Sequence, residues 1–297
     1  MDIAAKIASE LQIRNNQAEA AIKLIDEGNT IPFISRYRKE ATGALNDEQL
    51  RKLFERLNYL RNLEDRKSTV LSSIEEQGKL TAELKKQIES AETMVAVEDL
   101  YRPYKQKKRT RATIAKERGL SGLASIISLQ MTKKALEDEA KSYIDAEKDV
   151  PDTDTAISGA LDIIAEEISD SADYRTKIRS LTFKDGNLTS VAKDPEAESV
   201  YEMYYNFSSP VSKLTGYRVL AINRGEKEKV LTVKLEAPVD KILAYLEKQV
   251  IVRDNPNTTP YLKTAVADAY SRLIAPSIER EIRNELTENA EDNAITV

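Results

Sequence analysis

Apolar residues recur at helical spacing along almost the whole chain, and this periodicity constrains the fold more than any other feature. Its clearest stretch is a leucine-rich stripe that starts at Leu50 and repeats every three or four residues as far as Ile74. Asn46 and Gln49 precede the stripe with the spacing of a capping box, so the pattern predicts one helix over 47–77. At about 1.5 Å per residue, this helix would be roughly 45 Å long. A helix of that length is a spine on which shorter helices pack.

The apolar periodicity in the rest of the chain predicts further helices, so the expected fold is a mainly α, elongated multi-helix scaffold. A second long helix is expected over 154–183, and a shorter one over 193–206. Alternating residues at 230–235 and a β-branched run at 250–252 allow at most a small two-strand β element near 230–252. Pro260 opens the last helix, which Pro276 is expected to kink or divide.

The residues at 149–152 are a candidate boundary between two regions. The first, 1–150, is expected to be helical and to include a portion like a helix-turn-helix, because two short helices separated by a tight turn begin it. Such a pair either reads DNA or simply packs within an α domain, and the spacing alone does not separate these alternatives. The second region, 151–297, is expected to be helical as well.

Composition excludes several chemistries. The 297 residues include no Cys and no His, so thiolate nucleophiles, cysteine-ligated metals and imidazole bases are impossible. No GxxxxGK(S/T), GxGxxG or GxSxG spacing organises the remaining polar residues. We therefore expect no enzyme, no catalytic residue, no metal site and no cofactor.

An acidic stripe is the one group with metal-ligand character. Asp162, Glu166 and Asp170 follow one another at four-residue intervals and would share a helix face. Their carboxylates could hold Mg²⁺. A solvated helix face is the commoner explanation, because metal sites of this kind normally gather ligands from different elements.

No apolar run approaches the ~20 residues that span a bilayer. The first twelve residues lack the charged start and apolar core of a signal peptide. The expected location is the cytoplasm, with no membrane partner.

The charge is distributed unevenly although its sum is only −5. Residues 101–118 carry eight basic side chains against one acid, Glu117. Five of them lie on a stretch that Pro103 marks as a loop: Lys105, Lys107, Lys108, Arg109 and Arg111. No acid lies near them in sequence, so they are candidate phosphate contacts, and binding should weaken steeply with salt. The alternatives are a solvated loop or a contact with an acidic patch elsewhere in the chain.

A second candidate is the segment 30–43, which carries Arg36, Arg38 and Lys39 around Tyr37. The three cations could face phosphates while Tyr37 stacks on a base. The alternative is a helix junction in which the arginines pair with acids of a neighbouring helix.

Several stretches, taken together, resemble the N-terminal region of the bacterial Tex family of transcription accessory proteins. They are TIPFISRYRKEATGALNDEQL (30–50), LNYLRNLEDRK (57–67), LYRPYKQKKRTRATIAKERGL (100–120), YYNFSSPVSKLTGYRVLAINRGEKEKVL (204–231) and LIAPSIEREIRNELTENAE (273–291). The resemblance implies a helical, elongated region with a helix-turn-helix-like portion, from a cytoplasmic nucleic-acid-binding group tied to transcription. It also implies that the sequence is truncated, because members continue into a YqgF-type ribonuclease-H-like domain, a helix-hairpin-helix region and an OB-fold RNA-binding domain.

Two functions follow as expectations. The first is a nucleic-acid-binding transcription accessory protein whose scaffold contacts RNA or DNA through the basic loop. The alternative is a protein–protein interaction module that docks onto the transcription machinery, or onto the domains expected after residue 297, without binding nucleic acid.

Overall fold

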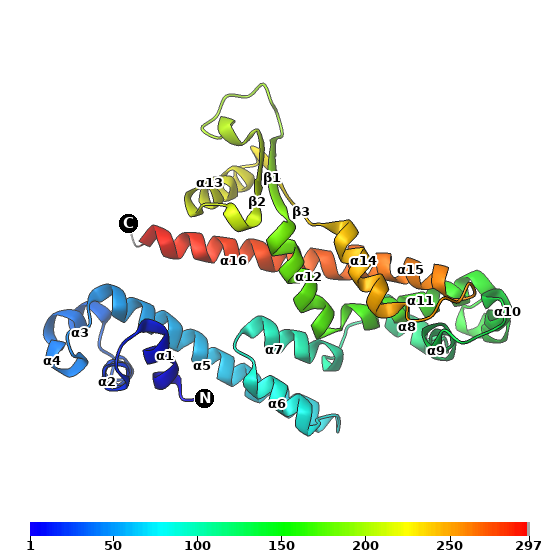
Figure 1. The fold of residues 1–297 in the computed structure, drawn as a ribbon, viewed down its shortest axis with the longest axis horizontal. Coiled ribbons are helices and arrows are strands. Elements are labelled where there is room, and N and C mark those ends of the chain that lie inside the picture. The colour runs from blue at the N-terminus through cyan, green and yellow to red at the C-terminus, as the bar shows by residue number, and fades with distance from the viewer. Residues whose placement is uncertain (296–297) are drawn as a thin grey trace. The chain divides into compact units, whose positions relative to one another are not determined.

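The chain forms two compact units in the computed structural model, which describes residues 1–295. The first is Met1–Tyr101, and the second begins at Arg102 (Figure 1). The boundary expected near residue 150 lies inside the second unit, where Val150 is fully buried. The two units are described separately below.

The first unit is entirely helical over the residues described. Its helices are α1 (Ile3–Leu11), α2 (Asn15–Asp26), α3 (Ile31–Tyr37), α4 (Lys39–Thr42), α5 (Asp47–Glu76), α6 (Ala82–Ser90) and α7 (Met94–Tyr101). Helix α5 confirms the predicted spine, because it begins at the Asn46–Gln49 capping box and buries the leucine stripe. The helices α1, α2, α3, α6 and α7 all pack on it.

Ion pairs between the forked guanidinium groups of arginines and carboxylates reinforce this packing. Three arginines of α5 each pair with a carboxylate of a different helix: Arg56 with Glu10, Arg61 with Asp26, and Arg66 with Glu98. Their N–O distances lie between 2.5 and 2.7 Å. The planar guanidinium matches a carboxylate in this geometry, so the forks fix where α1, α2 and α7 meet α5.

The second unit holds the longer run of elements. Its helices are α8 (Arg111–Glu117), α9 (Ser121–Leu129), α10 (Leu136–Ala140), α11 (Thr153–Ser169), α12 (Ala172–Asp185), α13 (Gly216–Lys227), α14 (Val239–Val250), α15 (Thr259–Asp268) and α16 (Ala275–Ile295). Helix α11 is central, because α8, α9, α10 and α15 pack against it (Figure 1).

The single helix predicted over 154–183 is wrong, since the chain divides there into α11 and α12. The Ser171 hydroxyl accepts from the backbone N–H of Tyr174 and so starts a new helix. Arg175, which is 1% exposed, holds the break from inside. Its guanidinium donates to the carbonyl and hydroxyl of Ser169, at 2.5 and 2.8 Å, and to Ser277 Oγ at 2.7 Å.

The β element is larger than predicted and differently placed. Strands β1 (Asn187–Ala192), β2 (Asn206–Pro210) and β3 (Leu231–Glu236) form an antiparallel sheet in the order β2-β1-β3. Of the two predicted strands, 230–235 is confirmed as β3, whereas residues 250–252 end α14 and continue as coil. The helix predicted over 193–206 is also wrong, because this segment is mainly a loop between β1 and β2, with one short turn at Glu202–Tyr204.

The helix that Pro260 opens is divided in two, which is one of the two outcomes expected for it. A π-helical segment, Ala269–Ile274, separates α15 from α16 and precedes Pro276. Proline has no N–H and its ring presses on the carbonyl four residues earlier, so a wider turn relieves the crowding. Across residues 1–295, no helix combines the length and the apolarity that crossing a membrane requires.

Candidate nucleic-acid interface

The basic loop occupies 105–110, between a short turn at Arg102–Tyr104 and the start of α8. Thr110 caps α8, because its hydroxyl accepts from the Thr113 N–H at 3.1 Å while its own N–H donates to Thr113 Oγ1 at 2.7 Å. The Thr110 hydroxyl also donates to Glu166 on α11 at 2.9 Å. Thr110 therefore fixes the C-terminal end of the loop against α11.

Lys107 fixes the loop at a second point. Its ammonium donates to Glu166 Oε1 at 3.1 Å and also to the carboxylate of Asp170, and its side chain is only 22% exposed. Burial raises the pKa of Asp170, and the hydrogen bond from Lys107 opposes this rise. The ammonium thus stabilises a carboxylate that burial would otherwise neutralise.

The acidic stripe therefore has neither of the roles considered from the sequence. Glu166 and Asp170 hold the loop, and Asp162 lies 3.8 Å from the guanidinium of Arg272. Within residues 1–295, no group of three acidic side chains is arranged to hold a metal ion.

The other four cations of the predicted site face solvent. Lys105, Lys108, Arg109 and Arg111 are all exposed. Arg109 makes one long pair with Glu117, at 3.8 Å between two well-exposed side chains, and such pairs contribute little. In the part of the chain that the structure describes, no carboxylate lies within 4.0 Å of the charged groups of Lys105, Lys108 or Arg111. The loop is thus anchored by Lys107 and Thr110 and presents its remaining positive charge to solvent.

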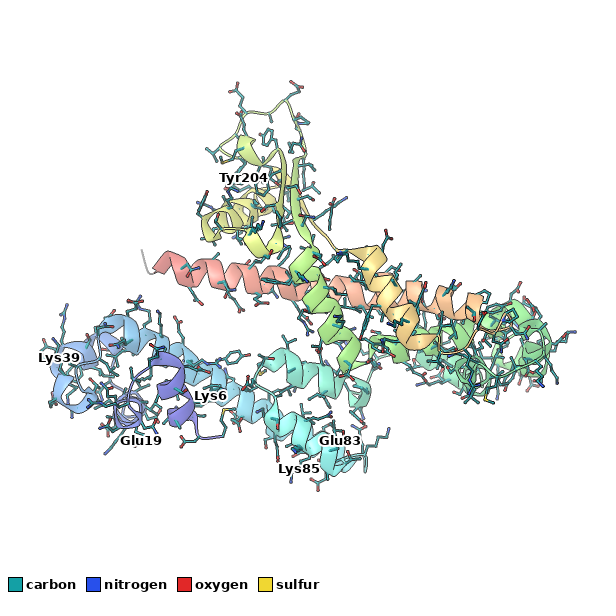
Figure 2. The ribbon with its side chains drawn as sticks, in the orientation of Figure 1. Lys6, Glu19, Lys39, Glu83, Lys85 and Tyr204 are labelled. Atoms are coloured by element: carbon teal, nitrogen blue, oxygen red, sulfur yellow. The ribbon has the colours of Figure 1, made fainter. Side chains whose placement is uncertain are left out.

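The second predicted site lies on the first unit. Arg36 and Lys39 are exposed at the end of α3 and the start of α4 (Figure 2 labels Lys39), whereas Arg38 pairs with Glu40 at 2.9 Å. Tyr37 is 65% exposed, and its ring centroid lies 5.3 Å from that of Phe33. The exposed Tyr37 ring and the two exposed cations agree with a nucleic-acid contact, whereas the Arg38–Glu40 ion pair agrees with the alternative of a helix junction held by ion pairs.

The predicted helix-turn-helix has the right elements but an unsuitable surface. Helices α1 and α2 pack together across a three-residue turn. The outer face of α2 carries Glu19 and Asp26 beside Lys23, and Asp26 is paired with Arg61. A helix that enters the major groove normally presents cations and amides, so this face favours packing within the unit over reading DNA.

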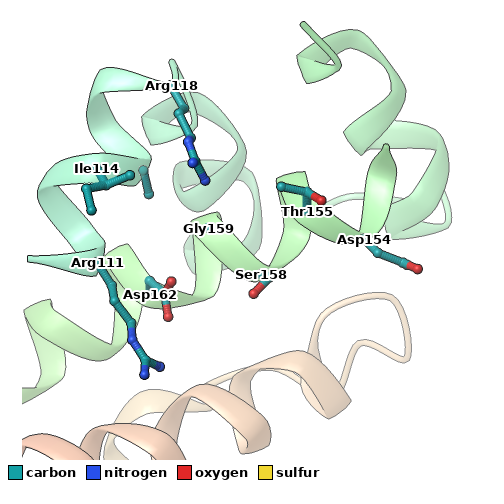
Figure 3. A pocket seen from close by; sticks show the side chains of 9 residues that line it. Arg111, Ile114, Arg118, Asp154, Thr155, Ser158, Gly159 and Asp162 are labelled. Atoms are coloured by element: carbon teal, nitrogen blue, oxygen red, sulfur yellow. The ribbon is translucent and has the colours of Figure 1, made fainter. Parts of the chain in front are cut away.

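A hollow beside the loop was not predicted. It has a volume of about 460 Å³ and lies between α8 and the first turns of α11 (Figure 3). The lining residues are Arg111, Ile114, Ala115, Arg118, Asp154, Thr155, Ser158, Gly159 and Asp162. Figure 3 shows Arg118 pointing toward Gly159 and Arg111 lying beside Asp162.

Arg118 belonged to the basic run of the sequence, but nothing singled it out there. The available signal is its position seven residues after Arg111, which is two helical turns and the same side of α8. Gly159 explains how closely the elements meet, because a Cβ at this position would overlap Leu120 Cδ1. The glycine therefore lets the corner between α8 and α9 lie directly on α11.

Two family models match the chain. The Tex-like protein N-terminal domain matches residues 1–75, and the Tex central region-like model matches residues 132–297. The basic loop lies between the two matched ranges.

Several curated relatives match nearly the full chain. YdcI of Bacillus subtilis is 46% identical over 98% of this chain, and the transcriptional accessory protein Tex of Neisseria gonorrhoeae is 39% identical over 100% of it. The human S1 RNA-binding domain-containing protein 1 is 30% identical over 92% of this chain. The matches take up 41%, 40% and 29% of these relatives, so the chain spans about two fifths of the length of the bacterial ones. Because the central-region model alone covers more than half of the residues, and the fold is mainly helical, the chain belongs to the Tex family.

Proposed function

We propose that this chain provides nucleic-acid contacts within a transcription accessory protein, and that its basic loop binds the phosphate backbone of RNA or DNA. The observation that carries the proposal is the anchored loop, from which Lys105, Lys108, Arg109 and Arg111 project into solvent. The names of two relatives, one a transcriptional accessory protein and one an S1 RNA-binding domain protein, support the setting.

The anchoring matters because it lowers the cost of binding. A free loop would lose conformational entropy when its cations gather on a phosphate chain. Here Lys107 and Thr110 already hold the loop on Glu166, so this cost has been met during folding. Lys107 is therefore a positioning residue in this proposal, and the four exposed cations are the phosphate contacts.

The surface of the first unit supplies a second set of contacts in the proposal. Arg36 and Lys39 would meet phosphates, and the exposed ring of Tyr37 would stack on an unpaired base. Arg38 contributes less, because Glu40 already offsets its charge. Stacking requires unpaired bases, so the proposal favours single strands on this surface.

The direct test is fluorescence anisotropy of a labelled 20-nucleotide strand, and of the matching duplex, titrated with the chain at low salt. The variant in which Lys105, Lys108, Arg109 and Arg111 are all changed to Ala should weaken binding by at least tenfold, because phosphate contacts dominate such affinities. Circular dichroism checks that the variant is folded. Absence of binding by the unaltered chain, or equal binding by the folded variant, would reject the proposal.

One observation favours the alternative, a protein-docking module. The loop between β1 and β2 exposes Val200 and Met203, at 87% and 71%, among four carboxylates: Asp194, Glu196, Glu198 and Glu202. Exposed apolar side chains rimmed by polar residues mark protein contacts where they form one contiguous patch. Binding of the chain to purified RNA polymerase that is lost in the V200D/M203D variant, with no nucleic-acid binding at low salt, would support this alternative.

A further inference from the structure

The hollow between α8 and α11 combines three kinds of group. Arg111 at the start of α8 and Arg118 directly after its end supply positive charge, and among the described residues no carboxylate lies within 4.0 Å of either guanidinium. Thr155 and Ser158 supply hydroxyls from α11, and Asp154 and Asp162 supply carboxylates. In Figure 3, Arg118 points toward Gly159, Arg111 extends past Asp162, and Asp154 lies farther along α11.

The apolar surface is built by Ile114, Ala115 and Gly159. The space that a Cβ on Gly159 would take is filled by Leu120 Cδ1, and Ala115 is only 3% exposed, so Ile114 is the half-buried apolar side chain that a ligand can contact. A flat ring can lie with one face against the Ile114 side chain. Apolar contact on the faces of a ring, with polar groups at its edges, is the usual arrangement in small-molecule sites.

We propose that this hollow binds one nucleotide. Arg111 and Arg118 would donate to its phosphate, and the ring would lie against Ile114. The carboxylates of Asp154 and Asp162 would accept hydrogen bonds from sugar hydroxyls or from the amino group of a base. The proposal deepens the proposed function, on which it rests, because Arg111 is also one of its four exposed phosphate contacts.

The dimensions and charges agree with this ligand. A volume of about 460 Å³ falls within the ~300–1,000 Å³ of small-molecule pockets. A bare anion would need only the arginines, whereas a nucleotide also carries the donors that carboxylates require. Asp162 repels the phosphate only weakly, because Arg272 lies 3.8 Å from it and burial raises the pKa of its carboxyl.

Isothermal titration with a nucleoside monophosphate tests the site on the intact chain. The unaltered chain should bind this probe more tightly than it binds either the nucleoside or inorganic phosphate alone. Arg118→Ala should weaken binding at least tenfold, because it removes one charge-assisted contact to the phosphate. Arg253→Ala is the matched control, since it removes one exposed arginine of the same unit outside the hollow and should leave affinity unchanged.

Three results would overturn the proposal. They are no binding of the monophosphate at millimolar concentration, equal binding by the folded Arg118→Ala variant, and binding of phosphate alone as tight as that of the nucleotide. Circular dichroism of each variant shows whether it is folded. Arg118→Lys keeps the charge but loses the fork, so we expect an intermediate affinity.

A competition separates a free nucleotide from a nucleotide within a strand. If an oligonucleotide displaces the monophosphate, the hollow receives one nucleotide of a bound strand. If both bind together, the hollow is a site for free nucleotide and is separate from the strand path. The K105A/K108A variant, which alters only the loop, should weaken strand binding and keep monophosphate binding, so failure of the proposed function leaves the hollow separately testable.

Discussion

The salt dependence of strand binding is the most quantitative consequence of the anchored loop. Each phosphate contact releases counterion, and for single strands it contributes about 0.7 to the slope of log K against log salt. Lys105 and Lys108 are exposed and have no carboxylate within 4.0 Å among the described residues, so both should contribute fully. The K105A/K108A variant should therefore reduce the slope by about 1.4.

The effect on affinity follows directly. Lys105, Lys108, Arg109 and Arg111 together contribute about 2.8 to the slope, which alone means a fall of about 50-fold between 50 and 200 mM salt. In the double variant this contribution drops to about 1.4, or about a sevenfold fall over the same range. Anisotropy of a labelled single strand at five or more salt concentrations measures both slopes.

The control removes the same charge from another surface of the same unit. Lys133 and Lys134 are exposed and lie between α9 and α10, outside the loop. K133A/K134A should leave the slope unchanged. If the loop variant and this control gave the same slope, the cations at 105 and 108 would not contact phosphate and the reasoning would be refuted.

Three predictions concern stability and are measured by denaturation or hydrogen exchange. Arg175→Ala should lower the free energy of unfolding by about 3 kcal/mol, because it leaves buried partners without their charged donor; a loss below about 1 kcal/mol in urea titration would contradict this. Gly159→Ala should lower the free energy of unfolding by about 1–3 kcal/mol through overlap with Leu120, and about 1 kcal/mol of helix propensity should offset this loss. Adding Leu120→Ala removes the overlap, so the effects of the two substitutions on the free energy of unfolding should not add. As the pH falls from 7, the protection factors of amides near Asp170, which compare each exchange rate with the intrinsic rate at the same pH, should rise, because burial raises the folded pKa of Asp170 above the unfolded value and the penalty on its ionised form is relieved. Below pH 4.5, the free energy of unfolding of the first unit should instead fall by a few tenths of a kcal/mol, because the Arg56 hydrogen bond lowers the pKa of Glu10. Equal pH responses near Asp170 and near Glu10 would contradict these two opposite pKa shifts.

Helical periodicity predicted those parts of the fold that local sequence decides. The leucine stripe of α5 and its Asn46–Gln49 capping box lie within one segment, and the predicted helix over 47–77 agrees with Asp47–Glu76. The strand predicted over 230–235 likewise agrees closely with Leu231–Glu236. In each case the stabilising contacts follow from a repeating pattern of apolar residues.

The errors occur where distant residues decide the structure. Strand β1 pairs with β2 and β3, so its conformation depends on residues far along the chain. Its buried Ser190 hydroxyl donates to the Tyr204 carbonyl at 2.6 Å, and a buried serine has no signature in an apolar pattern. The break between α11 and α12 depends on Arg175, whose partner Ser277 lies 102 residues later.

The candidate site shows the same division. Sequence located the basic loop, because its charge and Pro103 are local features. It could not separate Lys107 from its neighbours, since the partners Glu166 and Asp170 lie 59 and 63 residues away. Arg118 was missed for the same reason, because the hollow exists only where α8 meets α11.

Photo-crosslinking of a single strand that carries a photoreactive base, followed by mass spectrometry of the peptides, tests the central claim most directly. The account predicts crosslinks concentrated within 104–118, reduced in the K105A/K108A variant and retained in K133A/K134A. Crosslinks confined to other parts of the chain, or equally strong in both variants, would contradict it.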